Sequence, residues 1–149
     1  MAMTTETKQR ELVITRTFDA PRDLVFKAWT EPERVVQWLG PKGFEGLEFK
    51  MDEAGGTWHS KMRGPDGQVL TNGGRVLEYT EPERLAFTFK WDDGGSEETE
   101  IAITLVARGN QTEMTFRQGV FETTESRDGH RGGWSESFDK LGEYLERTA

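Results

Sequence analysis

Two histidines, His59 and His130, are the side chains best suited to acid–base chemistry near neutral pH, and the chain contains no cysteine. Without cysteine there is no disulfide, no thiolate metal ligand and no cysteine nucleophile. The two histidines lie far apart in the sequence and lack a second set of ligands, so we predict no metal site. Neither a Gly-x-x-x-x-Gly-Lys-Ser/Thr phosphate loop nor a Gly-x-Ser-x-Gly elbow occurs, and we predict no cofactor.

His130 is the stronger candidate of the two histidines. It lies four residues before Trp134 and extends the apolar stripe of a C-terminal helix if that helix begins early enough. In that position it would face the mouth of a cavity, where it can donate to a ligand or act as an acid or base. The alternative is a histidine satisfied by a backbone carbonyl at the start of the helix. Because no carboxylate partner can be placed beside it, we predict no catalytic residue.

Large aromatic and methionine side chains dominate the predicted inner faces of the strands and of the helix. Such faces form either a packed core or an apolar cavity with few polar groups, and both interpretations stay open here. Polar side chains on the same faces, Ser60, Thr99, Thr112 and Gln118, are candidates for orienting a ligand. The predicted cavity-lining residues are Trp58, Ser60, Met62, Phe87, Phe89, Trp91, Met114, Phe116, His130, Trp134 and Phe138.

Residues 133–147 carry the only long helical period in the chain. Trp134, Phe138, Leu141 and Leu145 follow one another at steps of four, three and four residues, which places them on one stripe of a helix. The start of this helix falls between residues 123 and 133. A helix with one apolar face needs a surface that covers it, and a curved antiparallel sheet is the surface that the rest of the chain predicts.

Alternation of apolar and polar residues predicts the sheet, with one covered and one solvated face. The predicted strands span residues 11–18, 44–51, 57–63, 68–79, 84–91, 97–107 and 112–120. Two short helices are predicted between residues 19 and 40, and Asn72-Gly73-Gly74 is interpreted as a bulge, with a turn as the alternative. This order predicts one α+β domain over residues 11–149, a curved antiparallel sheet wrapped around a long C-terminal helix, after a flexible tail at residues 1–10.

Composition and charge exclude several classes of partner. The chain has 149 residues and a net charge of -8, which opposes binding to nucleic acid and to anionic membranes because both require a basic face. No stretch is long and apolar enough to insert across a bilayer. The beginning of the chain lacks the apolar core of a signal peptide, so we expect a cytoplasmic location.

Short motifs spread over residues 11–146 resemble one known family. They lie at residues 17–21, 25–30, 38–41, 62–67, 82–85, 130–134 and 139–141. Together they resemble the family of activators of Hsp90 ATPase homologues, which belongs to the START-like (SRPBCC) superfamily. The resemblance implies a helix-grip fold, as in START and Bet v 1-like proteins, with a cavity between the sheet and the C-terminal helix. The superfamily hosts carriers, receptors and enzymes, so the fold alone fixes no activity.

The favoured hypothesis for the function is a non-catalytic protein that binds a small hydrophobic or aromatic molecule in this cavity. One alternative is an enzyme of cyclase or hydrolase type with His130 as acid or base. The other is a chaperone-associated module, linked to the stress response, that binds protein through the outer face of the sheet. Eukaryotic activators carry a separate N-terminal domain that contacts the chaperone, and this chain has no room for one, so we expect no direct binding to Hsp90. The identity of the ligand and the formation of a homodimer stay open.

Overall fold

Alternating inward and outward side chains build the strands of a curved antiparallel sheet in this computed structural model, which describes residues 9–92 and 97–148. In sequence order the strands are β1 (Leu12–Phe18), β2 (Glu45–Met51), β3 (Thr57–Arg63), β4 (Val69–Thr80), β5 (Arg84–Trp91), β6 (Thr99–Arg108) and β7 (Gln111–Gly119). Their order across the sheet is β1-β7-β6-β5-β4-β3-β2, and every neighbouring pair is antiparallel. The predicted strands are therefore confirmed, with small shifts at their ends.

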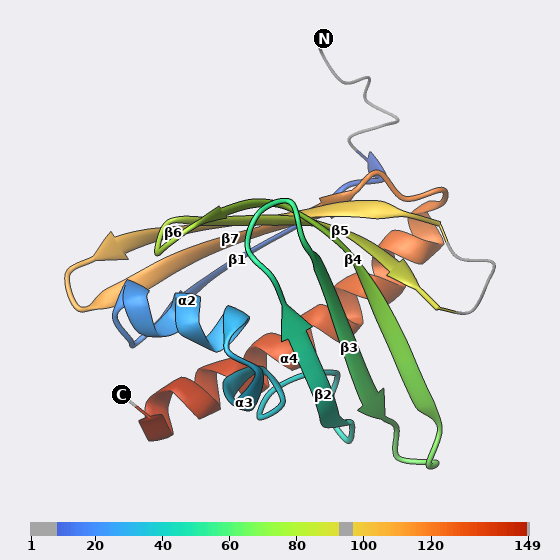
Figure 1. Cartoon of the computed structure of the whole chain (residues 1–149), viewed down its shortest axis with the longest axis horizontal. Helices are drawn as coiled ribbons and strands as arrows, with labels where there is room; N and C mark the ends of the chain where they lie inside the picture. Colours follow the sequence, from blue (N-terminus) through green and yellow to red (C-terminus); the bar gives the residue numbers. More distant parts are fainter. Residues whose placement is uncertain (1–8, 93–96, 149) are drawn as a thin grey trace, which may run out of the picture.

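Three helices within the described ranges complete the architecture: α2 (Arg22–Thr30), α3 (Pro32–Val35) and α4 (Thr124–Thr148). Figure 1 shows α4 running diagonally beneath the curled sheet, with α2 and α3 beside its C-terminal half. This is the predicted helix-grip arrangement, and it is confirmed. Residues 1–8 of the predicted tail lie outside the described residues, whereas Arg10 accepts a backbone hydrogen bond from Phe121 across 2.9 Å.

The helices are fixed to the β1 and β7 side of the sheet by an aromatic cluster. The ring of Phe138 on α4 lies 5.2 Å from that of Phe116 on β7 and 5.9 Å from that of Trp29 on α2, measured between centroids. The indole N–H of Trp38 donates to the carbonyl of Ala28 across 2.9 Å and ties the segment after α3 to α2. All of these side chains are buried, so this part of the interior is solid core.

The interpretation of Asn72-Gly73-Gly74 as a bulge or turn is wrong. These residues continue β4 in register with β3, and the register shift against β5 lies further on, between Val76 and Glu78. Glycine is required at positions 73 and 74 because the backbones of the neighbouring strands lie too close to leave room for a side chain. A Cβ atom on Gly74 would lie 2.1 Å from the carbonyl oxygen of Thr88.

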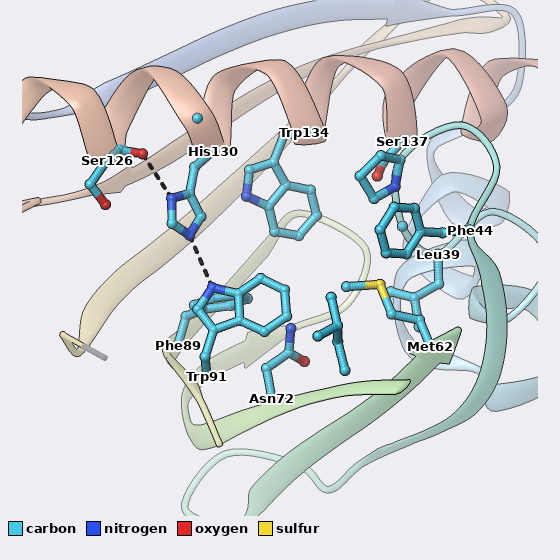
Figure 2. A pocket seen from close by; sticks show the side chains of 15 residues that line it. Leu39, Phe44, Met62, Asn72, Phe89, Trp91, Ser126, His130, Trp134 and Ser137 are labelled. Atoms are coloured by element: carbon cyan, nitrogen blue, oxygen red, sulfur yellow. Dashed lines mark hydrogen bonds between the residues drawn. The ribbon is translucent and has the colours of Figure 1, made fainter. Parts of the chain in front are cut away.

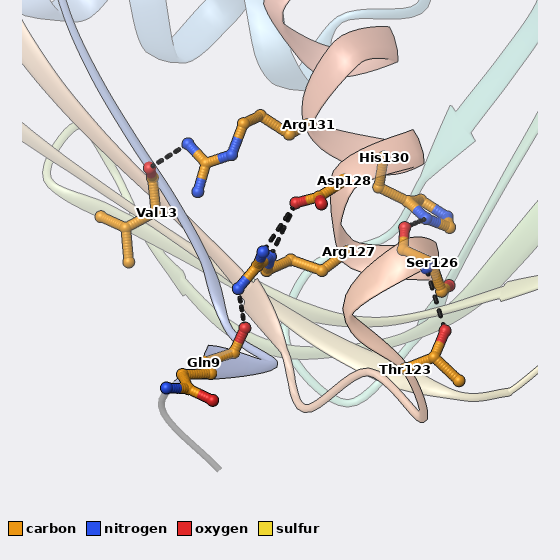
Figure 3. A network of polar contacts seen from close by, with 8 residues as sticks. All are labelled: Gln9, Val13, Thr123, Ser126, Arg127, Asp128, His130 and Arg131. Atoms are coloured by element: carbon orange, nitrogen blue, oxygen red, sulfur yellow. Dashed lines mark hydrogen bonds and ion pairs between the residues drawn. The ribbon is translucent and has the colours of Figure 1, made fainter. Parts of the chain in front are cut away.

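Helix α4 begins at Thr124, at the early end of the predicted range. The hydroxyl of Thr123 accepts a hydrogen bond from the backbone N–H of Ser126 across 3.0 Å, which caps the first turn. Further along this segment, the guanidinium of Arg127 donates to the carbonyl of Gln9, and that of Arg131 donates to the carbonyl of Val13 across 3.3 Å (Figure 3). These contacts hold a helical segment that contains three glycines, which by themselves disfavour a helix.

None of the helices within residues 9–92 and 97–148 combines the length and the apolar character needed to cross a membrane.

Candidate functional site

A pocket of about 390 Å³ lies between α4, strands β3 to β5 and the loop at residues 39–44. Its walls are apolar for the most part, and none of the lining side chains is an aspartate, glutamate, lysine or arginine. Figure 2 shows α4 along one side and the strands along the other, with aromatic rings projecting into the space between them. The lining residues are Leu39, Gly40, Pro41, Phe44, Met62, Leu70, Asn72, Phe89, Trp91, Ser126, Gly129, His130, Gly133, Trp134 and Ser137.

The structure divides the eleven predicted cavity-lining residues into two groups. Those that line the pocket are Met62, Phe89, Trp91, His130 and Trp134. Those that are buried elsewhere, outside its lining, are Trp58, Ser60, Phe87, Met114, Phe116 and Phe138. All eleven point to the interior side of the sheet or helix, but only the first group faces open space.

Trp58 illustrates why an inward side chain need not line a pocket. Its indole N–H donates to the backbone carbonyl of Thr88 across 2.7 Å, and its ring lies 5.0 Å from that of Phe87 between centroids. Both rings are thereby packed into the core beneath the strands. Alternation along a strand determines the face of a residue, not its distance from the covering helix.

His130 is held at both ring nitrogens. Its Nδ1 lies 2.9 Å from the carbonyl oxygen of Ser126, and its Nε2 lies 3.2 Å from the indole nitrogen of Trp91 (Figure 2). An indole nitrogen can only donate, so Nε2 of His130 must accept and the proton must reside on Nδ1. This leaves the neutral ring without a free nitrogen for proton transfer. The geometry is that of a structural histidine which bonds to a carbonyl in the first turns of the helix.

A smaller cavity of about 210 Å³ lies on the other side of His130. It shares Phe89, Trp91, Ser126 and His130 with the main pocket, so these side chains form a partition between the two. The hydroxyl of Ser126 donates to the carboxylate of Glu97 across 2.7 Å and thereby fixes the far wall. The Trp91–His130 hydrogen bond therefore lies within this partition.

Sequence reasoning predicted His130 and Trp134 in the lining but missed the other lining residues of α4, which are Ser126, Gly129, Gly133 and Ser137. The lining positions on the helix recur at i, i+3, i+4, i+7, i+8 and i+11, counted from Ser126 to Ser137, and so occupy a single helical face. That signal was present in the sequence, and the uncertain start of the helix concealed it. Leu70 and Asn72 also line the pocket, two residues apart on β4. The prediction of a bulge or turn at Asn72 concealed their shared face.

The loop at residues 39–44 forms a wall of the pocket and is fastened to α4 by Lys140. The ammonium group donates to the carbonyl oxygens of Leu39, Gly40 and Phe44, each across 3.1 Å, and approaches that of Pro41 at 3.4 Å. Burial lowers the pKa of Lys140 below its ordinary value. The loop has no regular secondary structure, and its other contacts with α4, from Lys42 to Glu136 and to Asp139, lie at the surface. Lys140 therefore provides the partly buried attachment of this wall.

The polar side chains predicted to orient a ligand are satisfied inside the protein. Gln118 donates to Thr99 across 3.0 Å and accepts from the indole of Trp134 across 2.8 Å. Thr112 donates to the carbonyl of Ala20 across 2.7 Å. None of the predicted polar residues lines the main pocket, and their role as ligand contacts stays a prediction.

His59 lies on the solvated face of the sheet, away from the pocket. Its Nε2 is 3.3 Å from a carboxylate oxygen of Asp92, and both side chains are about half exposed. Within residues 9–92 and 97–148, no three histidine, aspartate or glutamate side chains lie together in a way that could hold a metal ion.

Comparison with known proteins places the whole architecture in context. The family model described as "Activator of Hsp90 ATPase homolog 1-like protein" matches residues 19–146. No curated protein matches the chain. A solved structure from Chromobacterium violaceum is 26% identical with a TM-score of 0.83, and the match covers 92% of this chain and 97% of that one.

Two further solved structures show the same arrangement. A protein from Nitrosomonas europaea is 25% identical with a TM-score of 0.80, and the match covers 94% of this chain and 96% of that one. The AHSA1 protein from Silicibacter pomeroyi is 23% identical with a TM-score of 0.84, covering 93% of this chain and 99% of that one. At this last level of identity the likeness concerns the fold alone.

Proposed function

Because the chain belongs to the family of activator of Hsp90 ATPase homolog 1-like proteins, we propose that it is a binding protein for a small apolar or aromatic molecule held between the sheet and α4. The observation that carries this proposal is the pocket itself. Its volume of about 390 Å³ falls within the range of sites that take small molecules, and such sites are mostly apolar with a few polar groups.

The construction of the walls supports a binding role. Four aromatic rings from three different segments, those of Phe44, Phe89, Trp91 and Trp134, face the space. Aromatic rings offer large apolar contact areas and stack on planar ligands. Lys140 fixes the loop wall and His130 fixes Trp91, so the pocket keeps its shape without a ligand, which lowers the cost of binding.

The arrangement favours binding over catalysis. His130, the candidate acid or base, uses both ring nitrogens in internal hydrogen bonds. The lining carries no carboxylate, lysine or arginine that would polarise a bond in the ligand. Of the polar side chains that remain on the wall, Asn72 and Ser137 have no hydrogen-bonded base beside them, and the Ser126 hydroxyl donates to Glu97, which lines the smaller cavity and not the main pocket.

A pair of neighbouring substitutions on β4 tests the proposal. Leu70 lines the pocket, whereas Val69 next to it is 48% exposed on the opposite face. Leu70→Trp places a large ring in the pocket, and Val69→Trp adds the same ring outside it. The probe is 2-ethylnaphthalene, an uncharged apolar molecule, and its binding is measured by quenching of tryptophan fluorescence.

We expect saturable binding of one molecule to the wild type and to Val69→Trp, and at least about tenfold weaker binding to Leu70→Trp. Native mass spectrometry of freshly purified protein, followed by unfolding and organic extraction, then identifies any natural ligand that is retained. Equal binding to all three proteins, or no saturable binding to the wild type, would overturn the proposal.

A further inference from the structure

We propose that the molecule bound in the pocket is uncharged and carries a carbonyl-type acceptor oxygen, which the side-chain amide of Asn72 binds. This inference rests on the proposed function and names the chemical class of the ligand. Buried polar groups in proteins are hydrogen-bonded, so a polar group on the pocket wall that has no partner in the protein needs one from a bound molecule.

Asn72 has its oxygen satisfied and its nitrogen free. The side chain is only 4% exposed, and its Oδ1 accepts a hydrogen bond from the hydroxyl of Ser60, the residue opposite it on β3. Within residues 9–92 and 97–148, no acceptor is paired with its amide nitrogen. Figure 2 shows that nitrogen pointing into the pocket. Because Ser60 holds the oxygen, the amide presents its donor side to the pocket.

Most other polar side-chain groups on the wall already have partners in the protein. The pairs are Trp91 with His130 at 3.2 Å, Ser126 with Glu97 at 2.7 Å and Trp134 with Gln118 at 2.8 Å. The remaining exception within the described ranges is Ser137, which is 2% exposed and whose hydroxyl has no hydrogen-bond partner. It lies on α4, across the pocket from Asn72 (Figure 2).

The chemistry of these groups limits the ligand. An NH₂ group only donates, so the ligand must offer an acceptor to Asn72. No charged side chain lines the pocket to balance a charge on the ligand, and an unbalanced charge in an apolar site is costly. A ketone or amide oxygen on an aromatic or alicyclic body meets both conditions. The volume of about 390 Å³ equals that of about 13 water molecules, which is enough for a fused two-ring body.

The test compares two probes of nearly equal shape, 2-acetonaphthone and 2-ethylnaphthalene, which differ in the carbonyl oxygen. The variant is the double substitution Asn72→Leu/Ser60→Ala, which removes the amide without leaving the buried Ser60 hydroxyl unpaired. Binding of the hydrocarbon serves as the internal control, because it requires a folded pocket and no hydrogen bond.

We expect the double variant to keep its affinity for 2-ethylnaphthalene within about twofold and to lose affinity for 2-acetonaphthone about tenfold, the loss of one net hydrogen bond. With the ketone labelled at its carbonyl carbon, the ¹³C resonance of the bound probe lies further downfield in the wild type than in the variant. If the double variant loses no more affinity for the ketone than for the hydrocarbon, this inference is overturned and the proposed function stands. That result would mean that water, and not the ligand, satisfies the amide of Asn72. If neither probe binds the wild type, the proposed function fails together with the inference.

Ser137 provides a second, milder variant in case the double variant does not fold. Ser137→Ala is compared with Ser135→Ala, two residues earlier on the same helix and outside the lining. We expect Ser137→Ala to lower the affinity for the ketone about threefold more than the affinity for the hydrocarbon, and we expect Ser135→Ala to change neither affinity. If the double variant does not fold, the ¹³C resonance of the ketone bound to the wild type decides the question. A resonance upfield of that of the ketone in water, together with an unchanged ratio of ketone to hydrocarbon affinity in Ser137→Ala, would mean that no donor on the wall binds the oxygen and would overturn the inference.

Discussion

The indole N–H of Trp91 donates a hydrogen bond to Nε2 of His130 across 3.2 Å and so joins β5 to α4 between the two cavities. The two residues are 39 positions apart in the sequence, and no local pattern pairs them. The contact fixes the tautomer of the histidine, because the donor is an indole and the other ring nitrogen faces the carbonyl of Ser126.

The tautomer is directly observable. We predict that the neutral ring of His130 carries its proton on Nδ1, whereas the ring of His59 carries it on Nε2, because that nitrogen faces the carboxylate of Asp92 at 3.3 Å. Long-range ¹H–¹⁵N correlation spectra of the imidazoles at neutral pH distinguish the two forms, with His59→Gln to assign the signals. A protonated Nε2 on the neutral ring of His130 would show that the Trp91 contact is not made in solution.

Alanine substitutions at two glycines of α4 distinguish an effect on helix stability from an effect on the pocket. An added Cβ meets open space at both Gly129, which lines the pocket, and Gly132, which does not. We predict that alanine at either position raises the free energy of unfolding by about 0.5–1 kcal/mol, because alanine favours a helix over glycine. Urea unfolding followed by circular dichroism measures this gain.

The same two variants differ in ligand binding. The methyl group of Gly129→Ala enters the pocket, and burying one methyl against the ligand is worth about 0.8 kcal/mol. We therefore predict that Gly129→Ala binds 2-ethylnaphthalene about fourfold more tightly, whereas Gly132→Ala binds it like the wild type. Unchanged affinity in a stabilised Gly129→Ala protein would place the ligand away from this part of the helix.

Lys140→Met tests the fastening of the loop at residues 39–44. The substitution leaves several partly buried carbonyl oxygens without their donor, and hydrogen bonds to a charged group are worth more than neutral ones. We predict a loss of about 2 kcal/mol in the free energy of unfolding and weaker binding of 2-ethylnaphthalene. The control is Lys42→Met, whose side chain is 64% exposed and forms a surface ion pair with Asp139, so it should cost less than about 0.5 kcal/mol. Equal losses in both variants would contradict the role of Lys140.

The pH dependence of stability at Lys140 has a definite sign. Burial lowers its pKa from the ordinary value of 10.5, so in the alkaline range below 10.5 the unfolded chain binds more protons at this position than the folded protein does. The free energy of unfolding then rises with pH through that window. We predict that the stability of the wild type relative to Lys140→Met increases from neutral pH toward 10.5 in urea unfolding. A decrease would mean that the carbonyl oxygens raise the pKa more than burial lowers it.

Gly74 in β4 is predicted to be intolerant of any side chain. A Cβ atom there would lie 2.1 Å from the backbone oxygen of Thr88, and backbone in the middle of a sheet cannot move aside cheaply. We predict that Gly74→Ala lowers the free energy of unfolding by about 3 kcal/mol. Gly132→Ala is the control, because it adds the same methyl group where the Cβ atom meets open space. A loss below about 1 kcal/mol at Gly74 would show that β4 and β5 can separate locally.

Much of the fold follows from short-range patterns that the sequence displays openly. Alternation along β3 places Trp58, Ser60 and Met62 on the inner face, and the structure buries all three. The period of four, three and four residues from Trp134 predicts the helical stripe, of which Phe138, Leu141 and Leu145 are fully buried. These patterns are readable because the face of a strand or helix depends only on local geometry.

The site depends on features that no local pattern contains. Asn72 was misinterpreted because the adjacent glycines resemble a bulge or turn, and only the close approach of β3 and β5 explains them. The loop wall is held by Lys140, which lies 100 residues from Gly40. Such contacts join distant parts of the chain, so their partners become known only when the fold brings them together.

The sequence by itself determined which residues face inward, the order of the elements and the uncharged, aromatic character of the interior. The tertiary structure alone decided where that interior is solid and where it is open. Phe116 and Phe138 pack against each other beneath the helix, whereas Trp91 and Trp134 border the pocket, although all four are aromatic residues on predicted inner faces. The physical reason is that periodicity sets direction, while the separation between helix and sheet is set by the packing of every element at once.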